Sequence, residues 1–310
     1  MAVAEAQDRP QTAVASDGVA YVDGDYVPIG EAKISILDWG FTHSDVTYDV
    51  AHVWHGAVFR LEDHLDRFTA SMAGLRLDPG LSRDEIREVL LTCVRRTGLR
   101  DAYLAMLCTR GVLAPGQPRD PRILRNRFYA YAVPWVWVLS PEQQARGGHL
   151  KIVSTPRIPS DCVDPTIKNY HWGDLTQGLF EARDAGYDTA ILLDLDGNVT
   201  EGPGFNVFAV IDGTVVSPDR GALEGITRMS VFEVCDDLDI PHRVACITKA
   251  ELLDADEVFT SSTAGGVMPI SRVDDRIYGN DRPGPISLRI QERYWALHEE
   301  GRHATPVDYD

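Results

Sequence analysis

The sequence is poor in positive charge and has no long apolar run. Basic residues number 30 against 47 acidic ones, a net charge of −17 that argues against nucleic acid or an acidic membrane as a general partner. No stretch is apolar enough to cross a bilayer, and residues 1–10 lack the basic and apolar regions of a signal peptide. These absences predict a cytoplasmic protein with no membrane partner. An anionic cofactor is still possible, because local geometry can outweigh net charge.

Cysteine pairs and common catalytic motifs are also missing. The chain contains no CxxC, GxGxxG, Walker, GxSxG or HExxH motif. His52, His55 and His64 have no cysteine or carboxylate at ligand spacing, so we expect no metal site. Four of the five cysteines lie in apolar patterns that predict buried free thiols in a reducing compartment, namely Cys93, Cys108, Cys235 and Cys246.

Length and element order predict an α+β protein of two domains. The 310 residues exceed one average domain, and 44% hydrophobic with 25% charged residues is ordinary for a globular protein. Strand and helix patterns alternate without a strict βαβ rhythm. The predicted division is a flexible segment over residues 1–18, a small N-terminal α/β domain over 19–140, an interdomain linker over 141–148 and a large C-terminal domain over 149–310.

Turn residues and hydrophobic spacing locate the elements. Asp23-Gly24 and His55-Gly56 are turn pairs that predict hairpins over residues 19–28 and 48–61. Ser82 and Glu85 form a capping box that opens a helix ending near Gly98. Further strands are expected over 102–109, 128–138, 149–155, 189–194, 206–211 and 257–262, and further helices over 62–75, 172–185, 227–238 and 285–300, with a short one after Thr248.

Lysine is scarce, with only four among the basic residues, and Lys168 has the most informative surroundings. It follows a proline-bounded loop, and Ile167, Tyr170 and Trp172 would partly bury it. Burial lowers the pKa of an amine, which can then form a Schiff base with a carbonyl compound. Taken alone, Lys168 is more simply interpreted as a surface lysine.

Downstream features could serve a phosphate-bearing carbonyl cofactor. Glu201 ends a strand and could pair with a ring nitrogen, while Gly225-Ile226-Thr227 opens a helix whose N–H groups attract an anion. Thr263-Ala264-Gly265-Gly266 is a second small-residue turn, and Arg67 could bind phosphate in a bidentate manner. Each has an ordinary alternative: a turn-forming acid, a threonine N-cap or a solvated helix residue. Together with Lys168 they indicate a pyridoxal phosphate site.

The set of motifs resembles the fold-type IV pyridoxal-phosphate enzymes, which include branched-chain and D-amino acid aminotransferases. The resemblance covers about residues 19–300, and within the group the chain looks most like the (R)-selective amine transaminases. That closer likeness is carried by residues 41–50, 169–175 and 262–270. The general signatures are His64-Leu65-Asp66-Arg67, Lys168-Asn169, Thr200-Glu201-Gly202 with Asn206, Gly225-Ile226-Thr227-Arg228 and Thr263-Ala264-Gly265-Gly266.

The resemblance implies a homodimer whose cofactor lies between the two domains, the larger of which binds it. Lys168 would be the Schiff-base lysine and proton shuttle, and Glu201 would hold the pyridine nitrogen. The implied phosphate site is Arg67, Gly225, Ile226, Thr227 and Thr263. The implied substrate pocket is His43, Tyr48, Val50, Tyr103, Ala105, Trp172 and Ala264, with part of it reaching across the dimer interface.

Some positions depart from the amine transaminases. Ala105 stands where those enzymes tend to carry glutamate, and Tyr103 where phenylalanine is usual. The loop over residues 111–122 also differs in sequence. For the arginine that binds the acceptor carboxylate, Arg119 is the first choice and Arg122 the second.

These features predict a pyridoxal-phosphate transaminase. It would move an amino group from an (R)-configured primary amine or a D-amino acid to a keto acid such as pyruvate, with ping-pong kinetics. The alternatives are a branched-chain or D-amino acid aminotransferase, a lyase of the aminodeoxychorismate type, and a dimeric binding protein without cofactor. Pyruvate dependence separates the transaminase from the lyase, and a visible absorption band would exclude the binding protein.

Overall fold

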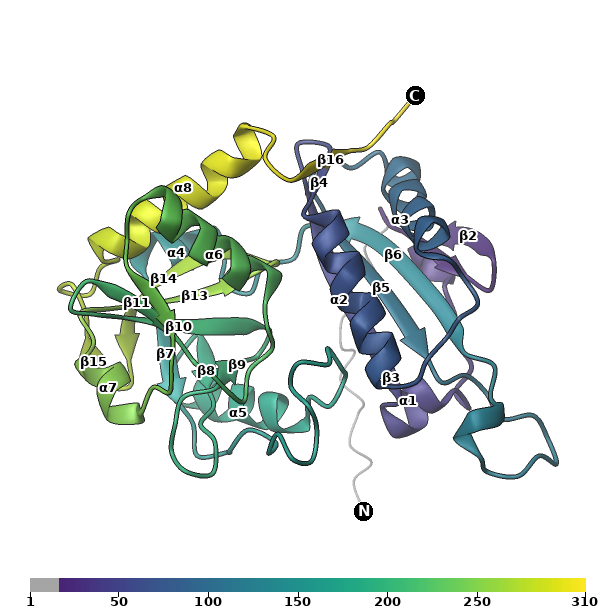
Figure 1. The fold of residues 1–310 in the computed structure, drawn as a ribbon, viewed down its shortest axis with the longest axis horizontal. Helices are drawn as coiled ribbons and strands as arrows, with labels where there is room; N and C mark the ends of the chain where they lie inside the picture. The colour runs from purple at the N-terminus through teal and green to yellow at the C-terminus, as the bar shows by residue number, and fades with distance from the viewer. Residues whose placement is uncertain (1–16) are drawn as a thin grey trace, which may run out of the picture.

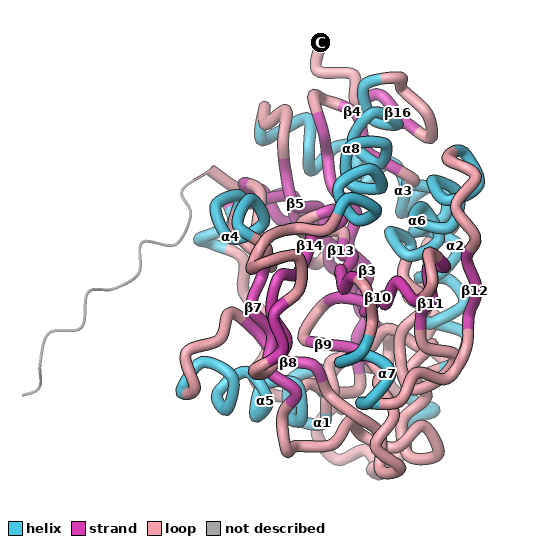
Figure 2. Tube along the Cα trace, turned by 90° about the vertical axis from the view of Figure 1, so that its left-hand side faces the viewer, coloured by secondary structure: helices cyan, strands magenta, loops and turns pink. Residues whose placement is uncertain are grey.

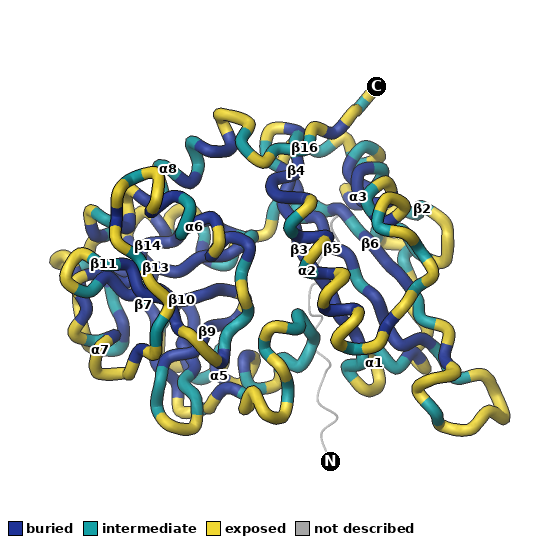
Figure 3. The backbone as a smooth tube through the Cα atoms, in the orientation of Figure 1, coloured by how far each residue is buried: buried dark blue, intermediate teal, exposed yellow. Residues whose placement is uncertain are grey.

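The chain forms two lobes, each built around one β-sheet with helices packed against it (Figure 1). The structure is a computed structural model that describes residues 17–310. The predicted segment 1–18 therefore lies almost wholly outside the described residues. Two sheets with interspersed helices confirm the predicted α+β class. In both lobes the central strands are buried, while loops, outward helix faces and edge strands such as β2 and β12 are largely exposed or half-buried (Figure 3).

The first lobe holds a seven-stranded antiparallel sheet in the order β16-β4-β3-β5-β6-β1-β2. The two predicted hairpins, β1–β2 and β3–β4, are both present. The strands are β1 (Val19–Val22), β2 (Asp25–Pro28), β3 (Val46–Trp54), β4 (Ala57–Phe59), β5 (Ala102–Thr109), β6 (Arg127–Pro134) and β16 (Ala304–Pro306). The helices of this part are η1 (Ile29–Glu31), α1 (Trp39–His43), α2 (Leu61–Gly74), α3 (Arg83–Thr97) and η2 (Pro121–Ile123).

Helices α2 and α3 cover one face of this sheet and form its main core. The predicted capping box of Ser82 and Glu85 opens α3, and Gly98 ends it in a left-handed conformation. Burial of apolar side chains at helical spacing is what holds such a helix on a sheet. On α2 the buried apolar side chains are Leu61, Leu65, Phe68 and Met72.

The opposite face of the first sheet is rich in tyrosine. Strand alternation directs Tyr48 and Val50 of β3 and Ala105 of β5 to this face. The partly buried side chains that pack with them are Tyr103, Leu107, Tyr131 and Tyr170.

The second lobe holds a nine-stranded mixed sheet with a main path β12-β11-β10-β13-β14-β7-β8, to which β15 and β9 add. Its strands are β7 (Gly148–Ile152), β8 (Thr189–Ile191), β9 (Glu201–Gly202), β10 (Phe205–Ile211), β11 (Thr214–Ser217), β12 (His242–Val244), β13 (Glu257–Ser262), β14 (Gly266–Val273) and β15 (Arg276–Ile277). Its helices are α4 (Pro141–Arg146), α5 (Gly173–Asp184), α6 (Ile226–Asp237), α7 (Lys249–Asp254) and α8 (Pro285–Glu299).

Two features differ from the predicted division of the chain. Residues 141–148, expected as a linker, form helix α4 and the start of β7, because Ser140 and Gln143 make a capping box there. After α8 the chain returns to the first lobe, where β16 pairs with β4 (Figures 1 and 2). The last residues therefore belong to the first sheet, and the domain boundaries stay a prediction.

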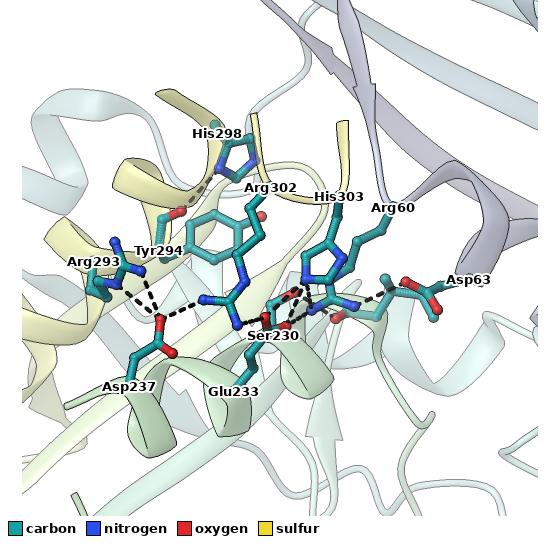
Figure 4. Close-up of polar contacts among 11 residues, drawn as sticks. Arg60, Asp63, Ser230, Glu233, Asp237, Arg293, Tyr294, His298, Arg302 and His303 are labelled. Atoms are coloured by element: carbon teal, nitrogen blue, oxygen red, sulfur yellow. Dashed lines mark hydrogen bonds and ion pairs between the residues drawn. The ribbon is translucent and has the colours of Figure 1, made fainter. Parts of the chain in front are cut away.

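An ionic network joins the lobes near the end of α8 (Figure 4). Arg60, between β4 and α2, contacts Asp63 at 2.9 Å and also contacts Glu233 of α6. Glu233 lies 2.6 Å from Arg302, which also bonds Asp237 at 2.8 Å. The beginning of α2 is thus tied to α6 of the other lobe.

The cysteines confirm most of the sequence prediction. Cys93, Cys108 and Cys235 are buried and free, whereas Cys246 is exposed, so the prediction of burial for Cys246 is wrong. Cys246 follows β12 at the edge of the second sheet, where no further strand covers it among residues 17–310. Within the same range, no helix is both long and apolar enough to cross a membrane.

Candidate active site

A cavity of about 260 Å³ lies between the lobes, and most of the predicted site residues line it. Its wall combines β3, β5 and α2 of the first lobe with the loop before α5, strand β9, the N-terminus of α6 and the turn after β13. The predicted residues that line it are Tyr48, Val50, Arg67, Tyr103, Lys168, Trp172, Glu201, Gly225, Ile226, Thr227, Thr263 and Ala264. The fold thus brings together motifs that are far apart in the sequence.

Lys168 is held through its backbone by the first lobe. Its carbonyl oxygen accepts hydrogen bonds from Thr47 Oγ1 at 2.7 Å and from the N–H of Tyr48 at 3.3 Å. Its own N–H donates to Ser71 Oγ at 3.3 Å. The amine Nζ lies 4.3 Å from the ring centre of Tyr48. The side chain therefore extends from a residue whose N–H and C=O are both fixed.

Glu201 is buried at the cavity wall, and both of its carboxylate oxygens accept hydrogen bonds. Oε1 accepts from Arg157 Nε and Oε2 from the N–H of Leu223, each at 3.0 Å. Burial raises the pKa of Glu201 above its usual value, and the Arg157 cation, the Leu223 N–H and Lys168 oppose that rise. Arg157 also bonds Asp174 at 2.7 Å, so one cation is shared by two buried carboxylates.

Arg67 lines the cavity in a fixed orientation. Its Nε and Nη2 donate to the two oxygens of Asp49, both at 2.8 Å, and Nη1 donates to the carbonyl oxygen of Glu224 at 3.0 Å. His64 Nδ1 lies 2.8 Å from the same carboxylate. Burial would raise the pKa of Asp49, but Arg67 and His64 outweigh burial and hold that pKa well below its usual range.

The N-terminus of α6 has the features of an anion site. No side chain caps its first turn within residues 17–310, so the leading N–H groups are available to an anion. A Cβ at Gly225 would lie 2.0 Å from Asn206 Oδ1, which leaves room for glycine alone. The Ser261 hydroxyl on the cavity wall is buried and has no hydrogen-bond partner among the described residues. With Thr227 and Arg67 beside them, these groups suit a phosphate monoester.

Three predicted substrate contacts and one alternative lie outside the cavity. Arg119 Nη2 lies 3.0 Å from His43 Nε2, and both side chains are exposed. Arg122, the second choice, is bonded to Asp120 at the surface. Ala105 is fully buried within the tyrosine-rich cluster. A contact between substrate and any of these residues stays a prediction.

Sequence reasoning missed the partners that hold the site. Asp49 is an acidic residue in the buried strand β3. A buried charge needs a partner, so an acid in such a strand is a signal that could have identified Asp49. Arg157 and Asp174 carry no comparable signal, because one lies in a proline-rich loop and the other in the first turn of a helix.

The described residues contain no group of three or more His, Cys, Asp or Glu arranged to hold a metal ion. His52 instead lies beside His298, with their Nε2 atoms 2.8 Å apart. Burial and the neighbouring His298 lower the pKa of His52 well below its usual value. This pair belongs to the packing of α8 against the first sheet.

Known proteins resemble the chain over most of its length. A family profile described as amino-transferase class IV matches residues 47–273. A putative branched-chain-amino-acid aminotransferase of Methanocaldococcus jannaschii is 32% identical over 277 residues, which cover 88% of this chain and 94% of the relative. The D-alanine aminotransferase of Bacillus licheniformis is 30% identical over 263 residues, which cover 84% of this chain and 90% of the relative.

The fold comparison agrees. The crystal structure of the branched-chain aminotransferase from the thermophilic archaeon Thermoproteus uzoniensis, with norvaline, matches with a TM-score of 0.85 and 30% identity. The match covers 94% of this chain and 99% of that one.

Proposed function

Because the chain belongs to the class IV aminotransferases, which use pyridoxal phosphate, we propose that it transfers an amino group from an (R)-configured primary amine or a D-amino acid to a keto acid such as pyruvate. The reaction would be ping-pong, since the cofactor carries the amino group between the two substrates. We further propose a cytoplasmic homodimer.

The observation that carries the proposal is the meeting of Lys168, Glu201 and the α6 N-terminus in one cavity. Pyridoxal phosphate supplies a reactive carbonyl and an electron-accepting ring. Arg67, with Gly225, Ile226, Thr227 and Thr263, would bind the phosphate. The Lys168 amine would attach the cofactor and move a proton at the substrate carbon, and Glu201 would hold the proton at the ring nitrogen.

The charges at the cavity favour an amine donor. Among residues 17–310, the cationic side chains that line it are Arg67, Arg157 and Lys168. Arg67 would be occupied by the phosphate, and Arg157 is already paired with Asp174 and Glu201. A substrate carboxylate would therefore need Arg119 to move in from its position beside His43. Aromatic and aliphatic walls formed by Tyr48, Val50, Tyr103, Val136, Val138 and Trp172 suit the apolar groups of an amine.

Exposed apolar side chains support the proposed dimer. Ile36, Leu37 and Phe41 are 76%, 64% and 65% exposed, and all lie just before β3. Contiguous apolar patches on a surface commonly mark protein interfaces. A second copy of the chain would cover them close to His43 and Arg119.

A branched-chain or D-amino acid aminotransferase is the second candidate, favoured by the names of the relatives. The test is a panel of donors, with each enantiomer of 1-phenylethylamine, D-alanine and L-leucine assayed separately against pyruvate and 2-oxoglutarate. We expect a visible cofactor band in the purified protein and turnover of the (R)-amine with pyruvate. Turnover of L-leucine or D-alanine without turnover of either amine would establish the second candidate, and product formation without acceptor would indicate a lyase.

A further inference from the structure

The backbone of Lys168 is attached to one lobe while most of its neighbours in the cavity belong to the other. Glu201, Thr227 and Thr263 come from β9, α6 and the turn after β13, all in the second lobe. The hydrogen bonds of the Lys168 backbone go instead to β3 and α2 of the first lobe. The place of the amine in the cavity therefore depends on the first lobe.

Thr47 of β3 makes the shortest of these contacts. Its Oγ1 donates to the Lys168 carbonyl at 2.7 Å, and its backbone forms an isolated antiparallel bridge with Asn169. The residue is 0% exposed, so water cannot replace the bond once it is lost. The contact fixes the peptide group that follows Lys168.

Ser71 of α2 fixes the peptide group on the other side. Its Oγ accepts from the Lys168 N–H at 3.3 Å. One turn further along α2, a Cβ at Gly74 would lie 2.6 Å from Ile167 Cδ1, so the helix end packs closely against this segment. The end of α2 is therefore shaped to receive the lysine-bearing segment.

The same strand and the same helix also hold Arg67. On β3, Thr47 and Asp49 are two residues apart and share a face. On α2, Arg67 and Ser71 are four residues apart and share a face. Asp49 orients Arg67, while Thr47 and Ser71 hold Lys168. One strand–helix pair thus sets the separation between the proposed phosphate contact and the lysine.

We propose that Thr47 and Ser71 are positioning residues, which place the Lys168 amine relative to a phosphate bound by Arg67. This inference rests on the proposed function. It predicts that loss of either hydroxyl weakens the covalent attachment of the cofactor to lysine and leaves phosphate recognition intact.

Two ligands separate these effects. Pyridoxal 5'-phosphate can bond to the lysine amine, whereas pyridoxine 5'-phosphate has a hydroxymethyl group in place of the aldehyde and cannot. In Thr47→Val, equilibrium titration of the apoprotein should show about five- to tenfold weaker binding of pyridoxal phosphate, the effect of one neutral hydrogen bond. Binding of pyridoxine phosphate should stay within about twofold of the unmodified protein.

The companion variants sharpen the test. Ser71→Ala should show the same pattern with a smaller loss, since its bond is longer, and Thr47→Ser should restore binding because it keeps the hydroxyl. Thr109→Val is the matched control. Thr109 is also buried in the first sheet, but its Oγ1 donates to Asp38 at 3.0 Å and does not contact Lys168. Its removal should leave the binding of both ligands unchanged.

Two results would overturn the inference. Equal weakening of both ligands in Thr47→Val and Ser71→Ala would show a general structural role, and unchanged binding of pyridoxal phosphate in both would show none. Failure of the unmodified protein to form a borohydride-sensitive visible band with pyridoxal phosphate would instead refute the proposed function.

Discussion

Two arginines of this molecule, Arg157 and Arg60, each bridge carboxylates, yet their surroundings differ. The Arg157 side chain is 8% exposed, and its partners Asp174 and Glu201 are 7% and 9% exposed. The Arg60 side chain is 5% exposed, but its partner Glu233 is 21% exposed. If the arginine is removed, water can therefore solvate the carboxylate of Glu233 but cannot solvate the carboxylate of Glu201.

The difference teaches what each network does. The Arg157 network lies inside the second lobe and opposes the rise in pKa that burial gives Glu201 at the cavity wall. The Arg60 network spans the lobes and ties α2 to α6 (Figure 4). Ion pairs of the same chemical kind thus serve the site in one place and the arrangement of the lobes in the other.

Breaking the buried network should have the largest effect. Arg157→Gln leaves Glu201 and Asp174 buried without their cation, which should lower the free energy of unfolding by about 3–5 kcal/mol. The folded pKa of Glu201 is already raised, and loss of Arg157 would raise it further. The folded variant then binds a proton that the unfolded chain lacks, so its stability deficit should grow as pH rises through that folded pKa.

Urea unfolding of both proteins at about pH 5 and about pH 8 measures this deficit. Arg157→Lys is the control that keeps a cation and should recover part of the stability. A deficit that is the same at both pH values would mean that Glu201 does not respond to Arg157.

The next effect concerns the cavity side of α2. Arg67→Ala removes a charged contact to phosphate worth roughly 1.5–3 kcal/mol, so cofactor binding should weaken by roughly ten- to a hundredfold. The variant also leaves the buried Asp49 with the His64 ring and the Val50 N–H as its remaining hydrogen-bond partners. Titration of the apoprotein with pyridoxal phosphate measures the loss, and unchanged affinity would remove Arg67 from the phosphate site.

Glu201→Gln should retain the fold and slow the chemistry. The amide keeps the shape of the carboxylate and one of its two accepted hydrogen bonds, and it loses the charge that would hold a proton on the cofactor ring. The amine-driven change in cofactor absorbance should slow on the order of tenfold or more. The reason is that the protonated fraction of the ring nitrogen falls by about a factor of ten for each unit by which its pKa drops. Stopped-flow absorbance with excess amine measures this rate, and a normal rate would leave Glu201 as a structural partner of Arg157.

The smallest effect should come from the network between the lobes. Glu233→Gln removes a carboxylate that contacts Arg60, Arg302 and His303, but partial exposure lets water compensate. We expect a loss of about 1 kcal/mol in unfolding free energy and no change in the cofactor spectrum. A shift in the cofactor spectrum would show that the ion pairs between the lobes affect the cavity. It would weaken the distinction between the Arg60 network and the Arg157 network.

Local signals made much of the molecule predictable. The predicted strand over 102–109 and the predicted α3 capping box match the structure, because propensity and capping depend on neighbouring residues. Lys168 in a loop, Glu201 in the short strand β9 and Gly225 at the start of α6 stand in segments with recognisable composition, and all three line one cavity. Their roles stay predictions, but their convergence followed from local pattern and family resemblance.

Features that depend on distant partners were missed. Arg157 and Glu201 are 44 positions apart, and neither sequence neighbourhood indicates the other. Strand β14 was not expected, because Gly266 and Pro269 are unfavourable in strands. The strand forms there because it pairs with β13 and β7. Strand β16 likewise exists because β4 offers an edge.

The central claim is that Lys168 carries the cofactor. The other lysines in the described residues are Lys33, which is exposed, and Lys151 and Lys249, whose amines lie 3.7 and 3.6 Å from Asp274. Borohydride reduction of the protein loaded with pyridoxal phosphate, followed by peptide mass mapping, locates the attachment directly. The account predicts one phosphopyridoxyl group per chain, on the peptide that contains Lys168. A label on Lys33, Lys151 or Lys249 instead, or no label at all, would contradict it.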